Sequence, residues 1–181
     1  MSEHDRRRWD ERYAGFEPVQ VPAVDPPSFL EPYADLIPTR GHALDIACGR
    51  GLGSVWLASR GLTVWGVDIS GVAITQARDL ATSLGFAELC RFDVVDLDDG
   101  LPAGPAVDVL LCNKFRDRRL DRAMIERLAP GGLLALCTLS EVGAEPGPFR
   151  ATRGELPSAF GELTLLAAGE AAGYAWLVGR A

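Results

Sequence analysis

The sequence predicts an α/β fold with a mostly parallel sheet, helices on both faces of the sheet and an antiparallel strand near the C-terminus. Apolar segments alternate with helical stretches along most of the chain, which is the pattern of parallel strands joined by crossover helices. A glycine loop follows the first apolar segment, as in the strand-to-helix turn of a βαβ unit. The last two apolar segments flank residues 169–173, which favours a hairpin, so the final strand is expected to run antiparallel to the others.

The order of these segments defines the expected elements. The chain is expected to open with a helix at Glu3–Ala14 that carries Trp9 and Tyr13 on one face, followed by a second helical stretch interrupted at Pro32. Strands are predicted near residues 42–46, 63–67, 88–92, 107–112 and 133–138, helices near 53–59, 71–84 and 118–128, and the hairpin strands at 163–168 and 174–180. We therefore expect one domain, with residues 1–40 as a helical cap and residues 41–181 as the core.

Composition narrows the class of protein. The 181 residues carry a net charge of −7, which disfavours a nucleic acid as the partner because that affinity depends on basic surface. The charged N-terminus has no apolar signal segment and no apolar run approaches a membrane span, so we expect a cytoplasmic protein without a membrane partner. The four cysteines form no C-x-x-C pair and only two histidines are present, which favours buried reduced thiols and no metal site.

The segment between the first two predicted strands carries the strongest functional signal. Gly49 and Gly51 lie in a G-x-G-x-G loop, and the next strand ends at Asp68, 19 residues after Gly49. That spacing is close to the one at which an acid meets a ribose diol. The glycine pattern differs from G-x-G-x-x-G, and Asp45 at the mouth of the loop would repel a pyrophosphate but favour an amino-bearing or cationic ligand. S-adenosylmethionine fits these requirements; ordinary turn glycines and strand-end acids are the alternative.

In these and other motifs the chain resembles the class I S-adenosylmethionine-dependent methyltransferases. More narrowly, it resembles their small tellurite-resistance and thiopurine methyltransferase-like group. The resemblance is carried by LDIACGRG (Leu44–Gly51), VDIS (Val67–Ser70), DVVDLDDGLP (Asp93–Pro102), LAPGGLL (Leu128–Leu134) and WDERY (Trp9–Tyr13). It implies a Rossmann-like methyltransferase fold with a seven-stranded sheet, in which residues 1–40 cap the cofactor site.

The resemblance also implies the residues that hold the cofactor. Asp45 would bind the amino end of the cofactor through the loop or a water, Asp68 would bind its ribose hydroxyls, and Asp96 would bind its adenine amine. For that last role, Asp93 or a solvated acidic turn without contact to the cofactor are the alternatives. The full set implied is Trp9, Tyr13, Asp45, Ala47, Cys48, Gly49, Gly51, Asp68, Ile69, Asp96, Leu97 and Asn113. Leu52-Gly53 departs from the polar pair that members of the family often carry after the second glycine.

The end of the fourth predicted strand lies at the edge of the sheet where open α/β folds bind ligands. We expect Asn113 to touch the cofactor or the acceptor, Phe115 to form an apolar wall, and Lys114 or Arg116 to attract an anionic acceptor, which makes Asn113, Lys114 and Phe115 the candidate catalytic residues. The alternative is a solvated helix start that includes Arg118 and Arg119. The loop of residues 141–153 is expected to overhang the acceptor, with Phe149, Arg150 and Arg153 as candidate contacts or as plain surface.

The predicted activity is in-line methyl transfer to a small molecule. Because the sequence offers few bases, the acceptor is expected to be a soft nucleophile such as a thiol, a chalcogen oxyanion or a phenol. Neither a Pro-Pro-aromatic segment after Asn113 nor a Pro-Cys pair is present, which disfavours nucleic acid methylation. A non-catalytic protein that binds the cofactor or supports a partner is the alternative, and another nucleoside-using transferase is a third hypothesis.

Overall fold

The computed structural model describes residues 3–17, 19, 21–147 and 149–181. It divides into two compact units, Met1–Pro102 and Ala103–Ala181, which are described separately here. Five positions of the predicted cap and of the 141–153 loop (residues 1, 2, 18, 20 and 148) lie outside the described part.

The first unit is built on three parallel strands, β1 (His42–Ile46), β2 (Thr63–Asp68) and β3 (Cys90–Val94), in the order β3-β2-β1. Helix α2 (Leu52–Ser59) connects β1 to β2, and helix α3 (Gly71–Ser83) connects β2 to β3. Because the strands are parallel and in register, their carboxyl ends finish at the same edge of the sheet. The acid that ends β2 and the loop that follows β1 are therefore brought together.

The core of this unit lies between its strands and its helices. Val55 of α2, Ile74 and Ala77 of α3 and Phe92 of β3 are buried in a single apolar cluster. Helix α3 begins at Ser70, whose hydroxyl oxygen accepts the N–H of Ala73 at 3.1 Å, as an N-cap residue does.

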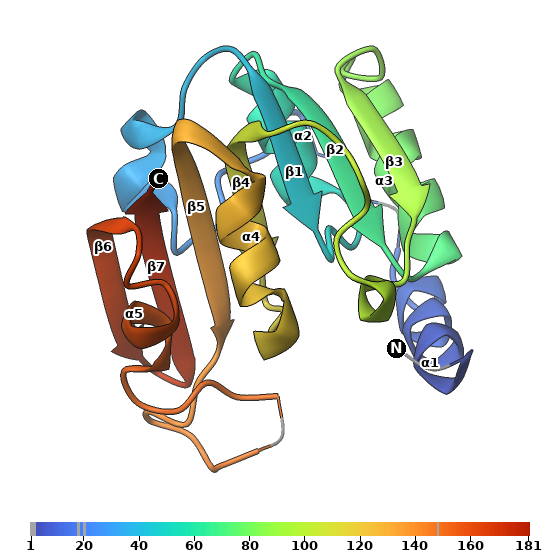
Figure 1. Ribbon diagram of the computed structural model, residues 1–181. Helices are drawn as coiled ribbons and strands as arrows, with labels where there is room; N and C mark the ends of the chain where they lie inside the picture. Colours follow the sequence, from blue (N-terminus) through green and yellow to red (C-terminus); the bar gives the residue numbers. More distant parts are fainter. Residues whose placement is uncertain (1–2, 18, 20, 148) are drawn as a thin grey trace. The chain divides into compact units, whose positions relative to one another are not determined.

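The remaining elements of the first unit are short. Helix α1 (Glu3–Ala14) has the predicted bounds, and Figure 1 shows it beside the start of α3. The second expected helix is a 3₁₀-helix, η1 (Glu31–Leu36), with Pro32 in its first turn, and η2 (Leu97–Asp99) follows β3.

The second unit contains β4 (Val107–Asn113), β5 (Leu128–Leu139), β6 (Thr164–Ala171) and β7 (Tyr174–Arg180), in the order β4-β5-β7-β6. β4 and β5 are parallel, whereas β7 is antiparallel to both of its neighbours, as predicted for the final strand. Positive φ angles at Ala172 and Gly173 (50° and 79°) form the hairpin turn. Figure 1 shows α4 (Asp121–Arg127) and α5 (Glu155–Ala159) over one face of these strands.

Three predicted boundaries were wrong. β3 begins at Cys90 and not at residue 88, because a turn hydrogen-bonds the N–H groups of Leu89 and Cys90 to the Phe86 carbonyl. β5 begins at Leu128, since Leu128 pairs with Val107 and a Cβ on Gly132 would lie 2.8 Å from the Val107 carbonyl oxygen. The expected helix 118–128 is split into η3 (Arg118–Leu120) and α4.

The split has a local cause. The side chain of Asp117 accepts the N–H of Arg119, and its carbonyl accepts the N–H of Leu120 at 3.1 Å, so the segment starts with a tight 3₁₀ turn.

None of the helices that the structure describes has the length and apolar character needed to cross a bilayer.

Candidate functional site

The glycine loop connects β1 to α2 through a run of left-handed backbone conformations. Ala47, Gly49 and Gly51 have φ angles of 51°, 53° and 77°. The loop is held by the N–H of Cys48, which donates to the Val67 carbonyl at 3.0 Å, and by the N–H of Gly51, which donates to the Cys48 carbonyl at 3.0 Å. The Cys48 thiol is folded back toward the Gly49 carbonyl, and burial raises its pKa well above the ordinary value.

The two glycines of this loop are needed for different reasons. A Cβ on Gly51 would lie 2.7 Å from the Ala77 side chain and 3.2 Å from Phe92, so its absence lets α3 and β3 pack against the loop. A Cβ on Gly49 would instead lie 2.8 Å from the Tyr13 hydroxyl. Gly49 therefore faces the capping helix, and Gly51 faces the core.

Asp68 ends β2 directly beside the loop. Its Oδ2 accepts the N–H of Gly49 at 2.8 Å and its Oδ1 accepts the N–H of Ser70 at 2.9 Å. Asp68 is 6% exposed, and this burial raises the pKa of its carboxyl group, against the lowering effect of the backbone N–H donors of Ser70, Gly49 and Ile69. A carboxylate has about four acceptor sites in all, so these donors leave room for a further one such as a ribose hydroxyl. The predicted role of Asp68 fits this geometry.

Asp45 lies beneath the loop and not at its mouth. It is 2% exposed because the residues of β1 from Ala43 onward are buried, and its Oδ2 accepts the Ser54 hydroxyl at 2.6 Å. Burial, and secondarily the charge of Asp68, raises its pKa to about 7, while the Ser54 hydrogen bond acts in the lowering direction. Any effect on the amino end of a cofactor would have to pass through the loop or a water.

Helix α1 brings Trp9 and Tyr13 to the loop. Their rings stack with centroids 5.8 Å apart, and the Tyr13 hydroxyl lies over Gly49. Burial and the neighbouring Asp68 carboxylate raise the pKa of Tyr13 above its ordinary value. The predicted aromatic pair is thus placed on the open side of the glycine loop.

Sequence reasoning missed how α1 is anchored. The Asp10 carboxylate accepts the Ser70 hydroxyl at 2.5 Å and the N–H of Val72 at 3.3 Å, and the Gln76 side chain donates to the Tyr13 carbonyl at 3.0 Å. Asp10 stands within the WDERY motif, three residues before Tyr13. That spacing placed it on the same face of the helix and was the available signal.

Arg50, inside the glycine loop, is a second missed contact. Its guanidinium lies 5.3 Å from the centre of the Phe16 ring and donates to the Glu17 carbonyl. The loop therefore also holds the segment that follows α1.

The end of β3 distinguishes the two acids proposed for the adenine amine. Asp93 accepts the Trp65 indole N–H at 2.8 Å and pairs with Arg91 at 2.6 Å, so it lies on the face of the strand. Asp96 begins η2, where it accepts the N–H of Asp98 at 2.9 Å. The preceding residue, Val95, donates its N–H to the Asp68 carbonyl at 2.9 Å. Asp96 is thereby placed close to the end of β2, and this favours it over Asp93.

Two apolar residues of the predicted set are buried. Ile69 is 3% exposed and Leu97 is 2% exposed, each next to one of the acids above. The first unit therefore gathers the glycine loop, the acids that follow β2 and β3 and a stacked aromatic pair, as the sequence predicts for a nucleoside site.

The other predicted residues, Asn113, Lys114 and Phe115, lie at the end of β4 in the second unit. Lys114 is exposed, adopts a left-handed φ of 63° and donates its N–H to the Cys137 carbonyl at 2.8 Å. Asn113 and Phe115 are half-buried. Their contacts with an acceptor stay a prediction.

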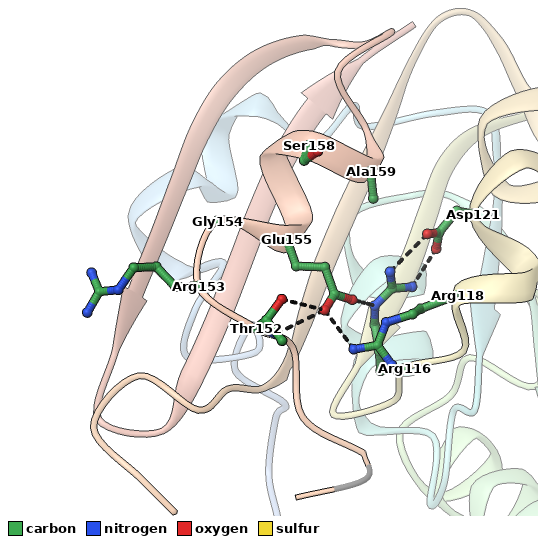
Figure 2. A pocket seen from close by; sticks show the side chains of 9 residues that line it. All are labelled: Arg116, Arg118, Asp121, Thr152, Arg153, Gly154, Glu155, Ser158 and Ala159. Atoms are coloured by element: carbon green, nitrogen blue, oxygen red, sulfur yellow. Dashed lines mark hydrogen bonds and ion pairs between the residues drawn. The ribbon is translucent and has the colours of Figure 1, made fainter. Parts of the chain in front are cut away.

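Arg116 does not have the free guanidinium that attraction of an acceptor would require. Figure 2 shows it between Asp121 and Glu155, and its side chain is 2% exposed. Its Nη2 donates to Asp121 at 2.9 Å and its Nε to Glu155 at 2.9 Å. Burial lowers its pKa, but the two carboxylates outweigh this effect and raise it. This arrangement favours neither attraction of an anionic acceptor by Arg116 nor a solvated helix start, because the buried guanidinium joins two parts of the unit.

Glu155 extends this cluster to the base of the 141–153 loop. It accepts from Arg118 at 2.7 Å and from the N–H of Thr152 at 2.9 Å, and so fixes the turn that precedes α5. Burial acts to raise the Glu155 pKa, but the donors, Arg118 first among them, lower it to about 2. An open pocket of about 370 Å³ lies beside this cluster (Figure 2).

The three candidate contacts of the 141–153 loop differ. Arg150 donates to the Ser140 carbonyl at 2.7 Å and so closes the base of the loop. Phe149 is 68% exposed, and Arg153 is exposed as well. Within the described part of the chain, no group of three or more His, Cys, Asp or Glu side chains is placed to hold a metal ion.

Comparisons with known proteins point in one direction. The methyltransferase domain family matches residues 43–132. The chain is 33% identical over 115 residues to methyltransferase GfsG of Streptomyces halstedii, covering 59% of this chain and 41% of that one. It is 30% identical over 135 residues to thiopurine S-methyltransferase of Pseudomonas fluorescens, covering 68% and 60%. The chain thus spans less than two thirds of these curated relatives.

A solved structure, TehB of Haemophilus influenzae, matches with a TM-score of 0.75 at 17% identity, covering 85% of this chain and 62% of that one. This likeness, with the strand directions above, confirms the predicted fold class. Ribosomal RNA small subunit methyltransferase C of Alcanivorax borkumensis is also 33% identical over 112 residues, covering 56% of this chain and 33% of that one. The expected lack of a nucleic acid partner therefore stays a prediction.

Proposed function

Because this chain belongs to the class I S-adenosylmethionine-dependent methyltransferase family, we propose that it transfers a methyl group from S-adenosylmethionine to a small-molecule acceptor. The observation that carries the proposal is the position of Asp68, fixed by the N–H groups of Gly49 and Ser70. It leaves a carboxylate that can accept a further donor beside the glycine loop, which Tyr13 covers.

In this proposal the candidate site residues of the first unit bind different parts of the cofactor. Asp68 accepts the two ribose hydroxyls, Asp96 accepts the adenine amine, and Ile69 and Leu97 supply apolar contact. Asp45, buried beneath the loop, acts on the amino end of the cofactor only through the loop or a water. Bound S-adenosylmethionine would supply an electrophilic methyl group on its sulfonium, so the protein has to align the acceptor and exclude water.

We further propose that the acceptor is a thiol, a chalcogen oxyanion or a phenol. Thiopurine S-methyltransferase is named for a sulfur acceptor. A second relative is the 2-heptyl-1-hydroxyquinolin-4(1H)-one methyltransferase of Mycobacteroides abscessus, 30% identical over 105 residues (55% of this chain, 46% of that one). A thiol reaches its nucleophilic form near neutral pH and needs little help from a base. Asn113, Lys114 and Phe115 are the residues proposed to meet the acceptor.

The net charge of −7 supports a small acceptor over a nucleic acid, whose backbone an acidic protein repels. Because one relative is a ribosomal RNA methyltransferase, the test below includes RNA as an acceptor.

The test is transfer of a labelled methyl group from S-adenosylmethionine to thiols, phenols, selenite and RNA by the purified chain. We expect turnover with at least one thiol or phenol and none with RNA. Asn113→Ala should lower turnover, whereas Arg119→Ala, a change of an exposed residue, should leave it unchanged. Cofactor binding without turnover on any acceptor would favour the non-catalytic alternative, and a lack of binding would exclude both.

A further inference from the structure

The attachment of α1 to the rest of the first unit is unusual for a helix that covers a site. None of its twelve residues, all of which the structure describes, is buried. Its aromatic residues Trp9 and Tyr13 are only half-buried, so polar contacts have to add to apolar packing in fixing its position.

The main polar contact is made by Asp10. Its Oδ1 accepts two hydrogen bonds, from the Ser70 hydroxyl at 2.5 Å and from the N–H of Val72 at 3.3 Å. Ser70 is fully buried, so this carboxylate reaches into the unit at the point where α3 begins. Val72 lies in the first turn of α3, where free N–H groups favour a negative charge.

The same serine also contacts the proposed ribose-binding acid. The Ser70 N–H donates to Asp68 Oδ1 at 2.9 Å, and Asp68 Oδ2 accepts the Gly49 N–H at 2.8 Å. A continuous chain of hydrogen bonds thus runs from α1 through Ser70 and Asp68 to the glycine loop. Three residues after Asp10, Tyr13 covers that loop at Gly49.

We propose that Asp10 is a positioning residue for the cofactor: its bonds to Ser70 and Val72 hold α1 closed over the glycine loop and set how long the cofactor stays bound. This inference rests on the proposed function of the first unit. Asp10 does not contact the cofactor in this account; it acts through Tyr13, which it keeps against Gly49, and through Ser70, which orients Asp68. These bonds of Asp10 to Ser70 and Val72, called the latch below, have to break before the cofactor can exchange.

The test measures the dissociation rate of labelled S-adenosylhomocysteine, displaced by excess S-adenosylmethionine, from the full chain and three variants. Asp10→Ala removes the acceptor of both hydrogen bonds and is expected to raise the rate at least about tenfold, since the loss of one charge-assisted hydrogen bond alone has about that effect. Asp10→Asn keeps an oxygen that accepts both bonds, so it should stay within about threefold of the unchanged protein. Glu11→Ala, an exposed acid on the same helix, should leave the rate unchanged.

A residue that only supports the fold would lower the melting temperature and leave the dissociation rate unchanged. We expect the reverse for Asp10→Ala, because α1 contributes no buried residue to the core. An Asp10→Ala rate within twofold of the unchanged protein would overturn the proposal.

A second measurement, without ligand, separates this inference from the proposed function. Amide hydrogen exchange in α1 should speed up about tenfold in Asp10→Ala, with the amides of β1 and β2 unaffected. If the unchanged chain fails to bind S-adenosylhomocysteine, the proposed function fails, and equal exchange in α1 of both proteins would by itself refute the latch.

Discussion

The carboxylate of Asp68 accepts the backbone N–H of Gly49 at 2.8 Å, although the two residues are 19 positions apart. The bond joins the end of β2 to the loop after β1, so the two parts of the proposed cofactor site fix each other. The bond gives Asp68 a structural role in addition to its proposed binding role, and the experiments below are designed to separate these two roles.

Gly51 tests whether the loop glycines serve packing as well as ligand approach. Gly51→Ala should lower the free energy of unfolding by about 2–5 kcal/mol, because the new Cβ meets Ala77 at 2.7 Å in addition to the strain of a positive φ. Gly85→Ala has a similar φ of 80° but open space, and should cost only about 1–2 kcal/mol. Equal losses in urea unfolding would show that packing at Gly51 is unimportant.

The two acids near the end of β3 should differ in binding. Asp96→Ala is expected to weaken S-adenosylhomocysteine binding by about 1–2 kcal/mol, since one hydrogen bond to the adenine amine is lost. Asp93→Ala should leave binding nearly unchanged, because its carboxylate is engaged by Trp65 and Arg91. Titration calorimetry on both variants decides which of the two acids binds the adenine amine. A larger loss for Asp93→Ala would reverse the assignment.

Asp45 predicts a pH dependence of stability. Its pKa is raised from 3.8 to about 7 in the folded chain, so between these values the folded state binds the proton that the unfolded state has lost. The free energy of unfolding should therefore fall with rising pH across pH 4–7, by up to about 1.4 kcal/mol per pH unit from this group.

Asp45→Asn keeps an acceptor for the Ser54 hydroxyl but cannot titrate. Its stability relative to the unchanged chain should rise from pH 4 to pH 7 in denaturant unfolding. Parallel curves for the two proteins would contradict the buried, protonated Asp45.

Arg116 is expected to act on stability. Arg116→Ala leaves the carboxylates of Asp121 and Glu155 without their buried partner, which should cost about 3–5 kcal/mol in urea unfolding. Arg122→Ala removes an exposed ion pair with Glu126 and should leave the free energy of unfolding almost unchanged. A small effect of Arg116→Ala would mean that the cluster is not structural.

Sequence periodicity was sufficient for most elements. β1 and β7 have the predicted bounds because each is an apolar run closed by clear turn residues. The start of β5 was missed, since Pro130 and two glycines read as a turn although Leu128 already pairs with Val107. Local patterns do not report such pairing between distant segments.

In the candidate site, too, local contacts were predicted and distant ones were missed. Asp68 and the glycine loop were predicted because their spacing is fixed by one βαβ unit. The bond between Asp10 and Ser70 spans 60 positions and depends on how α1 docks, and the Arg116 cluster joins residues up to 39 positions apart. Such contacts are set by tertiary structure alone, so local patterns left Arg116 open between attraction of an acceptor and a solvated helix start.

The measurement that tests the central claim most directly is calorimetric titration of S-adenosylhomocysteine into the unchanged chain, Asp68→Ala and Asp79→Ala. Asp79 is an exposed acid on α3, so its variant matches the charge change. The account predicts that Asp68→Ala loses about 1.5–3 kcal/mol of binding free energy and Asp79→Ala loses almost none. Equal affinities for all three proteins, with Asp68→Ala still folded, would contradict it.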